Sequence, residues 1–119
     1  MEPYVKTEII DGVGEIEFFH PKSNSLPAKM LKELAKSITD LGNRKSIKCI
    51  ILKSAGEKVF CAGAFFDELV EIDNEVDGYE FFSGFANVIR AIKNAPKFVV
   101  ALVQGKIVGG GVGIVSASD

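Results

Sequence analysis

The sequence predicts an α/β fold, in which helices pack on a largely parallel sheet. Three observations indicate this class. Strand-like and helix-like segments alternate along the chain, two of the strand-like segments are nearly continuous apolar runs, and each of those runs leads into a Gly-rich turn. Continuous apolar runs are typical of strands that are buried on both faces of a parallel sheet. At 119 residues, the chain has the length of one domain.

The chain begins with two strand-like segments, residues 5–10 and 13–18. The dipeptide Asp11-Gly12 lies between them, and such a pair between strands is the strongest short hairpin signal. We therefore expect an antiparallel hairpin at the N-terminus.

A turn at residues 20–25 precedes a segment whose apolar residues recur at helical spacing. This spacing predicts a helix over residues 27–41, with Ser25 as its N-cap and Gly42 at its end. The residues on its apolar face are Met30, Leu31, Leu34, Ile38 and Leu41.

The middle of the chain reads as a strand followed by two helices. Residues 47–53 form the first apolar run, which we expect to be buried on both faces. A short helix is expected over 65–72, with its acidic residues in solvent, and a longer one over 78–93, ended by Pro96. The apolar stripe of the longer helix is Phe81, Phe82, Phe85, Val88, Ile89 and Ile92. Residues 97–103 then form the second apolar strand.

Two Gly-rich turns, Cys61–Ala64 and Val108–Gly113, stand where helices are expected to open. The first N–H groups of a helix lack partners and carry partial positive charge. Small residues there let a ligand oxygen approach the backbone. Two such turns facing one another would supply the paired donors of an oxyanion hole, which predicts an enzyme of acyl or enolate chemistry.

Composition excludes several other classes. A net charge of −2 without a Lys/Arg cluster argues against a nucleic-acid surface. No apolar run is long enough to span a membrane, and the N-terminus lacks the features of a signal peptide. Cys49 and Cys61 read as reduced, buried thiols of a cytoplasmic protein, with Cys61 as a packing residue. His20, the only histidine, reads as a surface turn residue, so no metal site is expected.

The two turns and their flanks, residues 60–64, 103–113 and 117–119, resemble the crotonase superfamily of enoyl-CoA hydratases and isomerases. Residues 20–26 resemble the opening segment of that family. The resemblance implies a ClpP/crotonase spiral of β-β-α units, assembled as a homotrimer or homohexamer when complete. Because members are about twice as long, it also implies that residues 1–119 are the N-terminal part of the core domain and that the C-terminal half is absent.

The same resemblance implies an acyl-CoA substrate, with coenzyme A as part of the substrate and no further cofactor. The thioester carbonyl would lie between the N–H groups of Ala64 and Gly110, which serve as the catalytic donors. Lys22, Ser25 and Leu26 would lie near the nucleotide or pantetheine. The substrate-binding residues implied are Lys22, Ser25, Leu26, Ala62, Gly63, Ala64, Phe65, Gly109, Gly110 and Gly113.

The sequence departs from the family pattern at two visible positions. Gly113 stands where the hydratases have a glutamate, and Phe65 stands where many members have an aspartate. The second family carboxylate would lie beyond Asp119. The two-glutamate hydratase mechanism is therefore disfavoured, while isomerisation, dehydration and decarboxylation stay open.

Two other functions are compatible with the sequence. Gly113 would suit a module that binds acyl-CoA, or assembles with partners, without catalysis. A nucleotide-binding oxidoreductase domain is a weaker alternative, because the pattern G-x-G-x-x-G fails at Ile114 and at Ser116.

Overall fold

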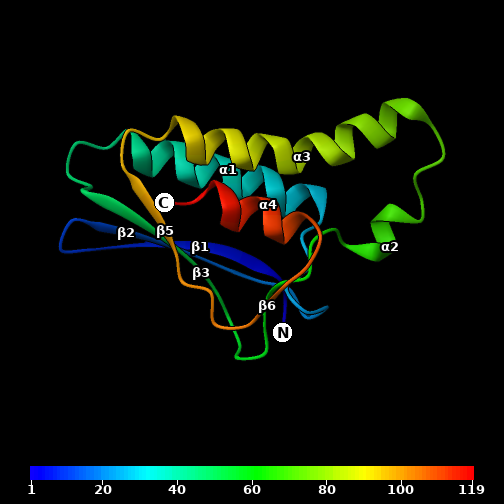
Figure 1. Cartoon of the computed structure of the whole chain (residues 1–119), viewed down its shortest axis with the longest axis horizontal. Coiled ribbons are helices and arrows are strands. Elements are labelled where there is room, and N and C mark those ends of the chain that lie inside the picture. The colour runs from blue at the N-terminus through cyan, green and yellow to red at the C-terminus, as the bar shows by residue number, and fades with distance from the viewer.

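The computed structural model describes residues 1–119. Helices α1, α3 and α4 form a layer over the main sheet, and the short α2 lies apart at one end (Figure 1). The elements in chain order are β1 (Tyr4–Ile10), β2 (Val13–Phe19), α1 (Ala28–Gly42), β3 (Cys49–Ser54), β4 (Val59–Cys61), α2 (Phe66–Leu69), α3 (Glu75–Asn94), β5 (Phe98–Ala101), β6 (Lys106–Ile107) and α4 (Gly110–Ala117).

The main sheet has the strand order β1-β2-β3-β5. Strands β1 and β2 are antiparallel, and β3 runs parallel to both β2 and β5, so the predicted α/β class is confirmed. The predicted hairpin is also confirmed. Asp11 and Gly12 have φ angles of 50° and 81°, and a tight type I′ turn needs positive φ at both central residues.

Helix α1 packs its predicted apolar face into the core, where Leu31, Leu34 and Ile38 are fully buried. The expectation that Ser25 caps this helix is wrong. Pro27 holds the N-cap position and offers no side-chain bond. The carboxylate of Glu68, from α2, accepts a hydrogen bond of 2.8 Å from the Ala28 N–H instead. A group expected in solvent thus serves as the cap, supplied by another element.

Helix α3 starts earlier than predicted, because the Asn74 side chain caps it by accepting a bond of 2.8 Å from the Asp77 N–H. Helix α2 is shorter than predicted and ends at Leu69. Most of the predicted stripe of α3 faces the core, but Phe82 is 55% exposed. Consecutive residues of a helix lie on different faces, so Phe81 and Phe82 cannot both be buried by one layer. None of the helices is both long and apolar enough to cross a lipid bilayer.

Helices cover only one face of the main sheet. The prediction that the two apolar runs are buried on both faces is therefore wrong. Residues of β3 alternate between buried and half-buried, and all three long helices lie on the same side (Figure 1). On the open face, Phe98 is 71% and Val100 is 40% exposed. The second run is also a shorter strand than predicted, since β5 ends at Ala101.

Two neighbouring isoleucines of β3 test this one-sided burial. Ile50 is fully buried, whereas Ile51 is half-buried on the open face. We expect Ile50→Ala to lower the free energy of unfolding by about 2–5 kcal/mol, because it leaves a cavity in the core. Ile51→Ala should cost less than half as much in urea denaturation of the same chain. Equal losses would contradict an open sheet face.

Candidate active site

The two Gly-rich turns meet because the strands that precede them pair with each other. Strands β4 and β6 run parallel, with Cys61 opposite Ile107, and the Val108 N–H donates to the Cys61 carbonyl over 3.0 Å. Both turns therefore leave the same end of a small two-stranded sheet. Neither strand was predicted, since segments of three and two residues are too short to show a period in the sequence.

The contact between the turns is backbone against backbone. A Cβ added to Gly63, whose φ is +87°, would lie 2.8 Å from the Val108 oxygen and 3.1 Å from the Gly110 nitrogen. A Cβ added to Gly111 would lie 2.8 Å from the Cys61 oxygen. Side chains cannot occupy such spaces, so only glycine allows this approach at either position.

The two N–H groups singled out in the sequence have no backbone acceptor. Gly110 is the first residue of α4, and neither its N–H nor that of Ala64 donates to a backbone oxygen. The next two amides of the helix, those of Gly111 and Val112, already donate to Val108 and Gly109. The structure therefore leaves the N–H groups of Ala64 and Gly110, which lie on two turns that touch, without a hydrogen-bond partner.

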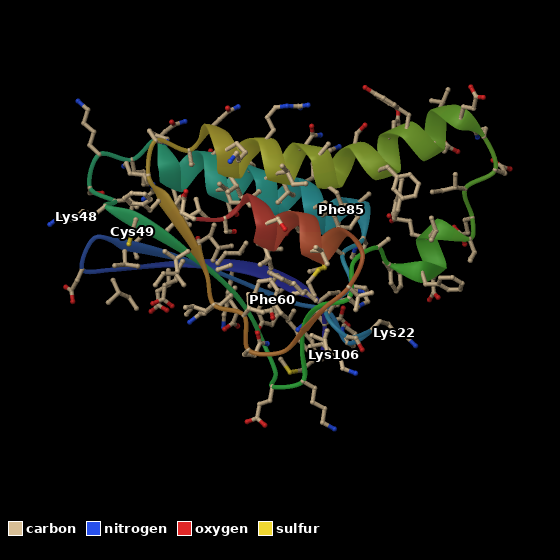
Figure 2. All side chains as sticks on the ribbon, viewed as in Figure 1. Lys22, Lys48, Cys49, Phe60, Phe85 and Lys106 are labelled. Atoms are coloured by element: carbon tan, nitrogen blue, oxygen red, sulfur yellow. The ribbon has the colours of Figure 1, made fainter.

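An aromatic side chain covers one side of the point where the two turns meet. The ring of Phe85 lies so near Gly110 that an added Cβ would come within 2.3 Å of the Phe85 Cε1 atom. Figure 2 shows Phe85 reaching from α3 toward the first turn of α4. Phe85 belongs to the buried core and therefore holds a fixed position.

The segment predicted to run along coenzyme A lies against the first turn. The Leu26 N–H donates to the Gly63 carbonyl over 2.8 Å, and Leu26 pairs with Ala64 in a parallel bridge. Lys22 is exposed, whereas Ser25 and Leu26 are buried. The side chain of Leu26 belongs to the core, so only its backbone is placed beside the turn.

The remaining predicted site residues border the two turns. Gly113 faces α3, where an added Cβ would lie 3.1 Å from the Ile89 Cδ1 atom. Gly109 has a φ of +56° and opens α4. Ala62, within the first turn, and Phe65, directly after it, are half-buried. These positions thus lie on or directly beside the two turns, with no carboxylate at position 113.

The burial of His20 was not predicted from the sequence. It is 7% exposed, not on the surface, and its ring lies 4.6 Å from that of Phe65. Its Nδ1 accepts a bond of 3.0 Å from the Lys22 N–H. Burial lowers the pKa of His20, although Asp67 opposes the change. Alternation could have revealed its burial, since Ile16 and Phe18 are buried in β2 and His20 continues their spacing of two just past the end of the strand.

Cys61 is a packing residue, as expected. Burial raises the pKa of its thiol to about 11, so the thiolate needed for nucleophilic chemistry is scarce near neutral pH. Its Sγ accepts a hydrogen bond from the Gly63 N–H at 3.4 Å. The thiol therefore supports the shape of the turn.

A cavity of about 860 Å³ lies elsewhere, between α1, α2 and α3. Leu31, Glu68 and Phe81 are among its walls, and none of the predicted site residues lines it. We therefore locate the candidate site by the contact between the two turns and not by the size of a cavity.

The contact between Phe85 and Gly110 can be tested by paired substitutions. Gly110→Ala should lower the free energy of unfolding by about 1–3 kcal/mol, because the new methyl group overlaps the ring. Combining it with Phe85→Ala should cost clearly less than the sum of the single changes. As the control, Gly113→Ala should shift stability by less than about 1 kcal/mol, since the flexible tip of Ile89 can move and alanine favours a helix. Additive effects of Gly110→Ala and Phe85→Ala would contradict the contact.

Comparisons with known proteins show the family of this chain. The family model described as enoyl-CoA hydratase/isomerase matches residues 8–119. A methylmalonyl-CoA decarboxylase of Escherichia coli is 33% identical over 98% of this chain and 44% of its own length. A mitochondrial methylglutaconyl-CoA hydratase of Mus musculus is 33% identical over 81% of this chain and 30% of its own length.

Solved structures share the fold. An enoyl-CoA hydratase from Bacillus halodurans matches 98% of this chain and 48% of its own, with 29% identity and a TM-score of 0.89. A human enoyl coenzyme A hydratase domain-containing protein matches 97% of this chain and 46% of its own, with 30% identity and a TM-score of 0.88. The chain thus spans less than half the length of these relatives, and its fold is that of the crotonases. It belongs to the enoyl-CoA hydratase/isomerase family.

Proposed function

We propose that the whole protein acts on acyl-CoA thioesters through an enolate whose oxygen is bound by the N–H groups of Ala64 and Gly110. One observation carries this proposal. The two turns touch, and each leaves one of these N–H groups without a backbone acceptor. An unpaired donor is costly unless water or a ligand satisfies it.

The chemistry explains why such donors would speed the reaction. When a thioester becomes an enolate, negative charge moves onto its oxygen. Donors that are already in place stabilise this charge without further reorganisation, and each is worth about 3 kcal/mol, or a factor of 10²–10³ in rate. The positive end of α4, which begins at Gly110, adds to the same effect.

The residue at position 113 restricts the class of reaction that we propose. Gly113 supplies no carboxylate, and Ile89 presents an apolar side chain to it. Decarboxylation of a 2-carboxyacyl-CoA forms the enolate without a base. The electrons of the breaking C–C bond move into the thioester carbonyl, carbon dioxide leaves, and the enolate then takes a proton from water. The relatives include both a methylmalonyl-CoA decarboxylase and a methylglutaconyl-CoA hydratase, so the residue at position 113 carries the choice of decarboxylation.

The surroundings of the turns also favour loss of carbon dioxide. Phe85 and Ile89 are apolar side chains that flank Gly110 and Gly113. A substrate carboxylate placed among such groups is poorly solvated, while the departing carbon dioxide is neutral and the charge passes to the N–H donors. Lys22, exposed on the neighbouring segment, would serve the phosphates of coenzyme A.

A second function, an acyl-CoA-binding module without catalysis, also has an observation in its favour. The candidate site offers the N–H donors but no carboxylate at position 113 for proton transfer. Such a module would bind the thioester and release it unchanged.

One assay separates these functions. The whole protein is incubated with methylmalonyl-CoA labelled in its free carboxyl group, and in parallel with an enoyl-CoA. We expect labelled carbon dioxide from the first and no hydration of the second. Hydration without release of carbon dioxide would overturn the assignment to decarboxylation, and binding without any turnover would favour the non-catalytic module.

Replacing a single amide by an ester tests the donors without adding a side chain. An ester in place of the Ala64 or Gly110 N–H should lower kcat by about 10²–10³. The matched control is an ester at Gly56, an exposed loop residue with nothing within 4 Å of an added Cβ. It should leave kcat unchanged. If the esters at 64 and 110 behave like the control, these N–H groups do not bind the developing oxyanion.

A further inference from the structure

Glu68 makes a contact that the proposed function does not explain. Its carboxylate accepts the hydrogen bond of 2.8 Å from the Ala28 N–H, across forty residues of sequence. This is the only hydrogen bond of its side chain, and none of the three salt bridges of the chain includes it. A half-buried carboxylate without a cation is costly in solvation, so the contact needs a reason.

Capping α1 does not by itself supply that reason. A serine, aspartate or asparagine at the N-cap position could accept the same kind of bond from within its own segment. Pro27 holds that position instead, and it makes no side-chain bond to the helix. The cap from Glu68 therefore achieves something that a local cap would not, because it ties α2 to the start of α1.

Helix α2 depends on this tie for its position. It consists of the four residues Phe66–Leu69, none of which is buried, and it lies apart from the layer of the three long helices (Figure 1). One turn of helix is not stable by itself, and helices in proteins take most of their stability from packing. Glu68 gives α2 a fixed contact with the rest of the chain that burial does not provide here.

The proposed donor Ala64 lies between two contacts made by one short segment. Before it in the chain, the Gly63 carbonyl accepts a bond of 2.8 Å from the Leu26 N–H. After it, Glu68 accepts the bond from the Ala28 N–H. The stretch of chain that contains Ala64 is thus held at both ends by the residues at the start of α1.

The first of these contacts sets the direction of the Ala64 N–H only in part. The Gly63 carbonyl and the Ala64 N–H belong to one trans peptide group, so they point in opposite directions. The bond from Leu26 therefore aims this N–H away from the segment before α1. A single bond still permits the peptide group to rotate about it, so a second contact is needed to fix the direction.

We propose that Glu68 is a positioning residue, which keeps the Ala64 N–H directed at the thioester oxygen by tying α2 to α1. This inference rests on the proposed function. The ring of Phe65 also packs on that of His20, with the ring centroids 4.6 Å apart. Loss of the Glu68 contact therefore loosens the segment without releasing it.

The test compares Glu68→Ala with Glu68→Gln in the whole protein, by the release of carbon dioxide from methylmalonyl-CoA. A displacement of about 1 Å can cost a factor of about 10² in rate, so Glu68→Ala should lower kcat about ten- to a hundredfold. KM should change by less than about threefold, because the bond to the donor strengthens mainly in the transition state. Glu68→Gln should recover most of kcat, because its amide oxygen accepts the same bond.

The matched control is Lys36→Gly, on the exposed face of α1. Glycine inside a helix destabilises it about as much as the loss of a cap, so this variant and Glu68→Ala should lower the midpoint of urea unfolding similarly. Lys36→Gly should leave kcat unchanged. If both variants lose kcat equally, if neither does, or if Glu68→Gln is as slow as Glu68→Ala, the inference is wrong.

A second measurement needs no turnover. In ¹H–¹⁵N spectra of the ligand-free whole protein, Glu68→Ala should shift the amide signal of Ala64, whereas Glu68→Gln and Lys36→Gly should leave it in place. A wild-type protein that releases no carbon dioxide would refute the proposed decarboxylation, and this signal would still decide the inference. An Ala64 signal that Glu68→Ala does not move would overturn it.

Discussion

The structure depends on a close approach of two backbone turns that tolerates no side chain. Gly63 lies against Val108 and Gly110, and Gly111 lies against Cys61. This contact fixes where α4 begins and which of its N–H groups remain unpaired. A third glycine allows the strands behind the turns to meet, since a Cβ on Gly105 would lie 2.4 Å from the Lys58 carbonyl oxygen. The chemistry proposed for the protein follows from this backbone geometry more than from any side chain.

The surrounding elements hold the contact in place. Strands β4 and β6 are too short to be stable by themselves, and each needs packing from outside. Asn24 ties the preceding turn to Val59 in β4, Leu26 bonds to Gly63, and Phe85 of α3 packs on Gly110. Groups from two distant parts of the sequence, residues 24–26 and helix α3, thus support one pair of turns. Such support is what a preorganised donor pair requires.

Periodicity in the sequence predicted much of the fold. The helix at Ala28–Gly42 and the hairpin at Asp11-Gly12 follow from local patterns, because the residues within each element determine its conformation. The one-sided sheet could not be predicted from Phe98 or Val100, since an apolar residue does not reveal whether another layer covers it. The cap on α1 comes from Glu68, forty residues away, and is equally invisible in the sequence. The glycines mark in the sequence the two turns that the structure brings together, whereas the burial of Ser25 emerged only in three dimensions.

The proposed chemistry requires that the amides of residues 64 and 110 bind one thioester oxygen together. The most direct measurement is to follow both amide signals by ¹H–¹⁵N NMR while acetyl-CoA is added to the whole protein. If both amides bind this oxygen, both proton signals move downfield in parallel and both amides exchange more slowly with solvent, because each gains an acceptor. Saturable binding that moves only one of the two signals, or neither, would contradict it.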